Sequence, residues 1–197
     1  MRRVILLAVL ALALPLMAWA DSSIDVSNAN GTITGSAAGL SLTGSTLFKF
    51  GSAVGSNLGS VSFTTGAFIS GNPQMGGTLA AGGTFTITGN GTNGVPNGVI
   101  FSGTFTSTST SPITWALTTL ANGTHSYTLS GAIADGSGRV GATTQLTVNT
   151  GKGFFNGTAG LSSGDTNLSV PEPGTLGLLG TGLIGIAGLM RRKLFGK

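Results

Sequence analysis

Residues 113–130 have the sequence ITWALTTLANGTHSYTLS, and this stretch carries the clearest structural signal in the chain. Large apolar or aromatic side chains alternate with small or polar ones on both sides of the central Asn122-Gly123 pair. The residues that share a side are Trp115 with Leu117, and His125 with Tyr127 and Leu129. Such alternation is typical of half-buried strands, and Asn-Gly favours a type I′ hairpin turn. The stretch therefore predicts a β-hairpin with strands at 113–120 and 124–130.

The period-two pattern recurs along the rest of the central region. Residues 84–88 alternate Thr with Phe and Ile, and a second hairpin is predicted to pair 127–133 with 143–148 across 135–138. Other residues expected to share one side of a strand are Val99, Phe101, Gly103 and Phe105. Gly and Thr abound while Glu and Lys are scarce, which disfavours helix. We predict a mainly β fold, a single antiparallel β-sandwich or barrel-like domain, with a solenoid as the alternative.

The basic residues concentrate at the two ends of the chain. The whole sequence has a formal net charge of +4, but six of its nine Lys and Arg residues precede residue 4 or follow residue 190. Between Asp21 and Ser169 three basic residues face four acidic ones, a formal net charge of −1. Such a region cannot neutralise phosphates, so we predict no nucleic-acid binding. The chain has no cysteine, which excludes disulfide and thiolate chemistry.

Residues 170–197 combine three features in a fixed order. Val170-Pro171-Glu172-Pro173 precedes an uncharged stretch at 174–190 rich in Gly, Leu and Ile, and Arg191, Arg192 and Lys193 follow it. A helix over 174–190 would be about 25 Å long, close to the ~30 Å hydrocarbon core of a bilayer. Because basic flanks stay in the cytoplasm, we predict a transmembrane helix with a basic stop and the proline motif outside. The alternative is a buried helix of a soluble core.

The tail resembles the PEP-CTERM sorting signal of exported proteins in Gram-negative bacteria. The resemblance rests on Val170-Pro171-Glu172-Pro173, on the Gly-rich apolar stretch ending at Met190, and on the three basic residues after it. It implies recognition by exosortase, a membrane protease-transpeptidase, and an association with exopolysaccharide and biofilm. The same tail module also goes by the name of an ice-binding protein C-terminal domain, which describes some of its carriers.

The N-terminus has the three parts of a secretory signal peptide. Arg2-Arg3 is a basic n-region, residues 4–14 are apolar, and Ala18-Trp19-Ala20 is an A-x-A site that predicts cleavage before Asp21. An uncleaved N-terminal anchor is the alternative. The predicted organisation is a signal peptide at 1–20, a β-rich exported domain at 21–149, a closing strand and spacer at 150–169, and the sorting tail at 170–197.

The exported region offers little for catalysis. His125 is the single histidine, and Asp25, Asp135 and Asp165 are far apart in the sequence, one in a predicted turn and one in the predicted spacer. A glycosidase needs two carboxylates in one cleft, and a calcium site needs a cluster of oxygen ligands. We predict no catalytic, cofactor-binding or metal-binding residues, and a protein that is not an enzyme. A hydrolase is the least favoured alternative.

Threonine at alternate positions is the most suggestive surface feature. It occurs at 32–34, 84–88 and 104–110 and would place hydroxyl and methyl groups on one face of a sheet, although Thr also simply favours strands. Such a face suits polysaccharide, with Trp115 or Tyr127 stacking on sugar rings, or ice. We predict an exported cell-envelope or extracellular-matrix protein, transiently anchored in the inner membrane and sorted by exosortase. Its predicted role is structural or exopolysaccharide-associated; ice binding or other surface adhesion is the alternative.

The basic stop leads to a first testable prediction. Replacing Arg191, Arg192 and Lys193 by neutral residues should let the tail pass through the membrane, because no positive charge then holds its end in the cytoplasm. Cell fractionation should find this variant outside the membrane, while a Lys197→Gln control stays membrane-bound. Unchanged membrane retention of the triple variant would contradict the role given to the cluster.

Overall fold

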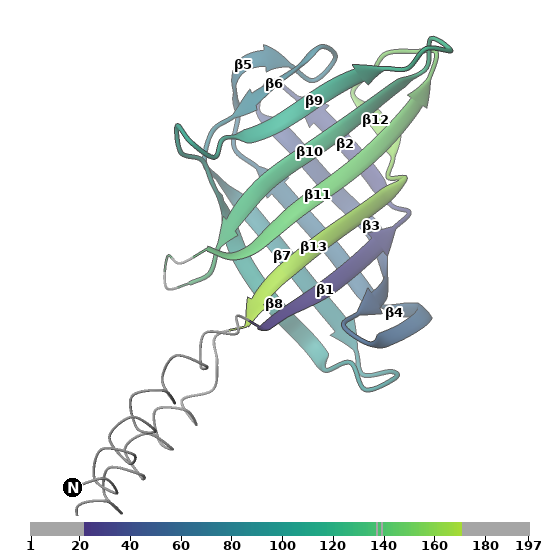
Figure 1. Cartoon of the computed structure of the whole chain (residues 1–197), viewed down its shortest axis with the longest axis vertical. Coiled ribbons are helices and arrows are strands. Elements are labelled where there is room, and N and C mark those ends of the chain that lie inside the picture. The colour runs from purple at the N-terminus through teal and green to yellow at the C-terminus, as the bar shows by residue number, and fades with distance from the viewer. Residues whose placement is uncertain (1–21, 137, 139, 171–197) are drawn as a thin grey trace, which may run out of the picture. The chain divides into compact units, whose positions relative to one another are not determined.

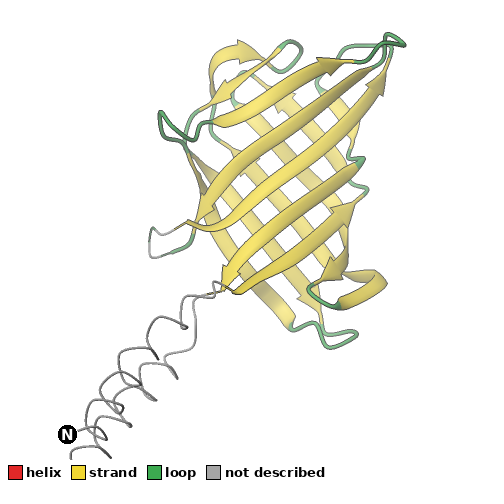
Figure 2. Ribbon diagram, in the orientation of Figure 1, coloured by secondary structure: helices red, strands yellow, loops and turns green. Residues whose placement is uncertain are grey.

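The computed structural model describes residues 22–136, 138 and 140–170, and this part of the chain is a β-barrel (Figures 1 and 2). The compact unit that holds the barrel runs from Ser23 to Ser169. The predicted signal peptide with its cleavage residues Ala18, Ala20 and Asp21 lies outside the described residues, as does the predicted tail from Pro171 onward. Within the described part, no helix is long and apolar enough to cross a membrane.

All regular elements of the described residues are strands. In chain order they are β1 (Ser22–Ala29), β2 (Thr32–Ser36), β3 (Gly39–Phe50), β4 (Ala53–Thr65), β5 (Phe68–Asn72), β6 (Gly76–Leu79), β7 (Gly82–Asn90), β8 (Asn97–Thr106), β9 (Ile113–Thr119), β10 (His125–Ala134), β11 (Val140–Gly151), β12 (Thr158–Gly160) and β13 (Ser163–Val170).

Eight strands close the barrel. β11, β13, β1, β3, β4, β7, β8 and β10 follow one another around the wall, and β10 pairs back with β11. The pairings are antiparallel, so neighbouring strands alternate in direction. β9, β6 and β5 extend the sheet from β10, while β2 and β12 pair with each other beside β3. The predicted mainly β, barrel-like fold is confirmed, and it is neither a solenoid nor a sandwich.

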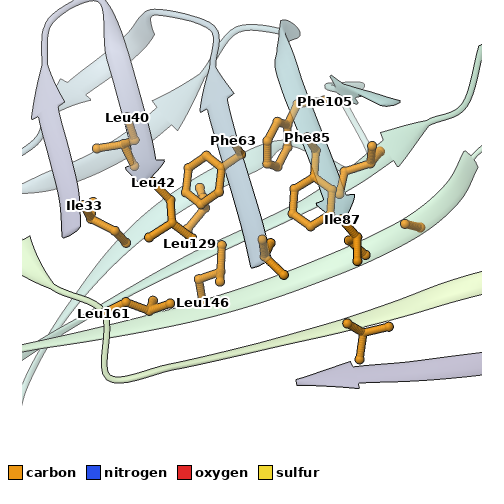
Figure 3. Close-up of a cluster of buried hydrophobic side chains, with 14 of the residues drawn as sticks. Ile33, Leu40, Leu42, Phe63, Phe85, Ile87, Phe105, Leu129, Leu146 and Leu161 are labelled. Atoms are coloured by element: carbon orange, nitrogen blue, oxygen red, sulfur yellow. The ribbon is translucent and has the colours of Figure 1, made fainter. Parts of the chain in front are cut away.

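Period-two alternation fills the barrel with side chains. In β7, Phe85 and Ile87 are fully buried while the threonines between and beside them face outward. Phe105 of β8 meets Phe63 and Phe85 edge to face, with ring centroids 5.7 and 5.9 Å apart (Figure 3). Each such ring contributes about 2–3 kcal/mol by leaving water. An eight-stranded barrel is just wide enough to be filled in this way, so the interior is a packed core.

Trp115 and Tyr127 are also core residues, which corrects the prediction that they face sugar rings. Both are fully buried, and their rings stack at 5.2 Å. The Trp115 indole N–H donates to the carbonyl of Pro73 at 2.8 Å, and the Tyr127 hydroxyl donates to the carbonyl of Gln74 at 2.7 Å. These bonds satisfy the polar tips of buried rings and hold the turn between β5 and β6 over the core.

Both predicted hairpins are present, but the Asn-Gly turns differ from expectation. β9 pairs with β10, and β10 pairs with β11 across 135–138. At Asn122-Gly123 only the glycine has a positive φ, so the turn is not type I′. Two Asn-Gly dipeptides have positive φ at both residues: Asn30-Gly31, at 62° and 82° between β1 and β2, and Asn93-Gly94, at 52° and 80°, where the Val95 N–H donates to the Thr92 carbonyl. Loop length, which the dipeptide does not specify, selects the turn type.

A bulge in β8 corrects the predicted side of Val99. The register shifts so that Phe101 pairs with Ile87 but Val99 pairs with Thr88. One extra residue in one strand reverses the faces of the residues beyond it. Phe101 therefore points toward the core, where it meets Phe85 edge to face at 6.3 Å, whereas Val99 is 67% exposed on the outer surface.

The segment 150–169, predicted as a closing strand and spacer, does contain a closing strand, β13, but this strand lies where the spacer was predicted. β13 lies between β11 and β1, and its register with β11 runs from Ser163 opposite Thr147 to Leu168 opposite Ala142. The inward positions include Gly164, where an added Cβ would overlap the Leu146 side chain. The close packing at Gly164 requires a residue without a side chain there, and with Thr166 at the next inward position it gives the segment its spacer-like composition.

Gly164 supplies a test of this close approach. Gly164→Ala should destabilise the barrel by about 1–3 kcal/mol, because the methyl group would overpack a filled core. Gly160→Ala is the control, since nothing lies within 4 Å of a Cβ at that position in β12. Denaturant unfolding followed by tryptophan fluorescence measures both. Equal stability of the two variants would contradict the packing described for β13.

Candidate functional site

A row of five hydroxyl side chains crosses the outer wall from β12 to β7. Its members, each the register partner of the next, are Thr158, Thr34, Ser41, Thr64 and Thr84. We call this set the hydroxyl row. Ser41 is half-buried and the other four are exposed. The row exists because the sequence neighbours Ile33, Phe63 and Phe85 point into the core, which turns the alternate positions outward.

Hydrogen bonds within the hydroxyl row fix the positions of four of its five oxygens. Thr34 Oγ1 and Ser41 Oγ are 2.7 Å apart, and Thr64 Oγ1 and Thr84 Oγ1 are 3.2 Å apart. The Thr84 backbone N–H also donates to Thr64 Oγ1 at 3.0 Å. A hydroxyl can donate one hydrogen bond and accept two, so each oxygen keeps capacity for a ligand. The row is an ordered set of donors and acceptors without charge.

A shallow depression of about 280 Å³ adjoins the hydroxyl row. Its nine lining residues, none of them charged, are Thr34, Gly35, Ser36, Ala38, Gly39, Leu40, Ser41, Thr64 and Thr65. Gly39 has a φ of +123°, and a Cβ there would overlap the Gly66 carbonyl oxygen. Thr65 Oγ1 accepts from the Leu40 N–H and donates to the Gly66 carbonyl, both at 2.9 Å. These contacts hold the turn between β2 and β3 against the end of β4.

Two shorter rows extend the hydroxyl surface across neighbouring strands. Ser62, Thr86 and Ser102 are successive register partners on β4, β7 and β8. Thr46, Ser60 and Thr88 are partners on β3, β4 and β7. The outer wall from β3 to β8 therefore carries hydroxyls in register, as the alternation of threonines predicts.

The charged residues of the wall pair locally, away from the hydroxyl row. Lys49 Nζ on β3 lies 2.6 Å from Asp25 Oδ2 on β1, and Ser27 Oγ donates to Asp165 Oδ1 at 2.9 Å. The hydrogen bond and the charge of Asp25 raise the pKa of Lys49 above its usual value. Asp165, predicted in a spacer, is part of β13. These groups connect the three strands β13, β1 and β3.

His125 lies at the start of β10 and is mostly buried. Its Nδ1 is 3.0 Å from Thr119 Oγ1, and its ring stacks on Phe154 with centroids 4.2 Å apart. Its neighbours are thus a hydroxyl and a phenyl ring. Among the described residues, no group of three His, Cys, Asp or Glu side chains could hold a metal ion. Phe154, which the sequence reasoning did not single out, is the ring that reaches solvent, 44% exposed.

Comparison with known families identifies a motif in one segment of the chain. The model of the PEP-CTERM protein-sorting motif matches residues 169–193, which confirms the resemblance found in the sequence. The match implies an exported, envelope-associated protein that exosortase processes. The individual roles of Val170, Pro171, Glu172 and Pro173, and of Arg191, Arg192 and Lys193, stay predictions. No curated protein and no solved structure matches the chain.

Adjacent threonines at the end of β4 allow a matched test of the site. Thr65→Val should cost about 1–3 kcal/mol, because the buried Leu40 N–H loses its acceptor. Thr64→Val removes an exposed hydroxyl and should change stability by less than about 0.5 kcal/mol. Denaturant unfolding of both variants measures the difference. If Thr64→Val is the more damaging change, the row is part of the folding core rather than a surface.

Proposed function

We propose that the barrel of this exosortase-sorted exported protein is a structural, exopolysaccharide-associated element of the cell envelope or matrix. The hydroxyl row and its depression are the proposed contact surface. The observation that carries this proposal is the register-paired set of uncharged hydroxyls from Thr158 to Thr84, four of which are fixed by hydrogen bonds to one another. Because packed side chains fill the interior, a ligand would contact the outer surface of the barrel.

The chemistry of the row favours a neutral polysaccharide. Sugar hydroxyls pair with an array of donors and acceptors, and threonine methyl groups cover the apolar parts of a sugar ring. Five strands about 4.8 Å apart make a row about 19 Å long, long enough for several sugar units of an extended chain. Each hydrogen bond to a neutral partner contributes about 0.5–1.5 kcal/mol. Affinity therefore comes from repeated contacts along a polymer, as in other multivalent binding.

The barrel shape supports polysaccharide over ice. A wall that closes on itself twists from strand to strand (Figure 1), so the hydroxyls of successive strands turn relative to one another. A flexible polymer can follow that twist, whereas a crystal face cannot. We also propose that the protein acts without catalysis. His125, Asp25 and Asp165 have their own partners in Thr119, Lys49 and Ser27, and they belong to three different strands.

A sedimentation assay with insoluble polysaccharides tests the proposed contact surface. The released protein should co-sediment with neutral polysaccharides. A Thr34→Val, Thr64→Val double variant should bind about tenfold more weakly, since two or more hydrogen bonds are lost. The matched control is Thr118→Val with Thr143→Val, which removes two exposed hydroxyls on β9 and β11.

Several outcomes of this assay would contradict the proposal. Equal binding of polysaccharide by the two double variants would show that the hydroxyl row does not take part in the contact. Ice shaping without sedimentation, lost on Thr86 or Thr106 substitution by bulky residues, would support the ice-binding alternative. Turnover in a hydrolase screen that His125→Ala abolishes would make the protein an enzyme.

A further inference from the structure

The last strand of the barrel runs directly into the sorting motif. β13 keeps its register with β11 as far as Leu168 and ends at Val170, while the motif match begins at residue 169. Only Pro171, Glu172 and Pro173 separate β13 from the uncharged stretch predicted to enter the membrane. Three extended residues reach about 10 Å, and the headgroup layer of one leaflet is itself about 5–8 Å thick. A barrel held by so short a connection cannot stand clear of the membrane.

Strand directions identify the end of the barrel that leads to this connection. Because neighbouring strands around the wall alternate in direction, the end of β13 lies at the same rim as the start of β1. That rim also carries the turns between β3 and β4, β7 and β8, and β10 and β11. We call it the exit rim. The turn between β2 and β3, which lines the depression beside the hydroxyl row, belongs to the opposite rim.

Three exposed valines surround the exit rim. Val54 is the second residue of β4, Val99 the third of β8 and Val140 the first of β11, and they are 65%, 67% and 54% exposed. Isolated exposed apolar side chains are common, and the opposite rim has its own, Ile69 among them. Apolar exposure alone therefore does not select a rim. The three-residue connection identifies the exit rim as the end nearest the membrane, and it makes the lipid headgroup layer the partner of the three valines.

We propose that the anchored precursor rests with its exit rim against the lipid headgroups, with Val54, Val99 and Val140 at the interface and the hydroxyl row facing away. Exosortase then meets its motif at the edge of a folded barrel, flanked by that rim. The proposal rests on the predicted membrane segment at 174–190 and is independent of polysaccharide binding.

Site-specific fluorescence can test this orientation, since the chain has no cysteine of its own. The full-length precursor is placed in phosphatidylcholine–phosphatidylethanolamine vesicles with one polarity-sensitive label at Val99→Cys, Val54→Cys or Ile69→Cys. Ile69 is the matched control, because it is 69% exposed on the opposite rim. A further precursor has a 20-residue Gly-Ser insertion after Val170, which adds roughly 25 Å of mean reach.

The expected result is a loss of iodide quenching and a gain of quenching by headgroup-labelled lipid at positions 99 and 54, with neither change at 69. The inserted spacer should return both exit-rim labels to the behaviour of the label at 69. Equal quenching at 99 and 69 in the precursor, or no effect of the spacer, would overturn the proposal. So would a precursor that does not float with the vesicles, because the anchor itself would then be absent; polysaccharide sedimentation is measured separately and would not be affected.

Discussion

The pairing of the last strand with the first is the constraint on which the whole structure depends. β13 fills the place between β11 and β1, and without it the wall would have two open edges. The side-chain bond from Ser27 to Asp165 joins residues 138 positions apart. Contacts of such long range are formed at a high cost in chain entropy and make folding slow. The barrel can therefore close only when residue 170 is available, which in an exported chain means after the whole domain has crossed the membrane.

The closing seam of β11, β13 and β1 places small and polar residues among inward aliphatic ones such as Leu146 and Leu168. Asn28 on β1 is fully buried and donates to Ser45 Oγ at 2.6 Å, and Thr144 and Thr166 bond to each other at 2.9 Å. Gly164 brings β13 close to Asn28 and Leu146. The phenylalanine cluster lies under β4, β7 and β8, and the stacked Trp115 and Tyr127 lie on β9 and β10. The aromatic rings thus lie away from the seam, whereas buried polar groups occur among the aliphatic residues at the seam, where hydrogen bonds satisfy most of them.

The difference between the aromatic side of the core and the seam explains which strands could be predicted from the sequence. Alternation over 84–88 and 113–130 predicts strands correctly because one face is uniformly large and apolar. A closing strand within 150–169 is predicted, but its position at β13 is not, since Gly164 and Thr166 occupy inward positions where alternation would require apolar residues. It places Trp115 and Tyr127 outside because alternation separates two faces without saying which one is buried. Val99 is misplaced because a bulge changes the parity of the strand, and no residue pattern marks that bulge.

The candidate site, too, could be predicted from the sequence only in part. The alternate threonines are visible in the sequence, but the hydroxyl row depends on register across five strands, which pairs Thr34 with Ser41 and Thr64 with Thr84. Register is set by the packed interior, since a shift of one residue would turn every outward hydroxyl inward. The phenylalanines of the core therefore determine the order of the outer surface, although none of them reaches it.

The closed barrel does not depend on the tail that follows Val170. The pairs that β13 makes with β11 end at Leu168, so a cut on the C-terminal side of Val170 removes none of them. Processing by exosortase then costs the folded domain no strand pairing. The same strand that completes the wall presents the motif at the rim, and the hydroxyl row lies toward the other rim. Processing of the tail and the proposed contact through the hydroxyl row thus involve different parts of the barrel, and neither requires strand pairs to break.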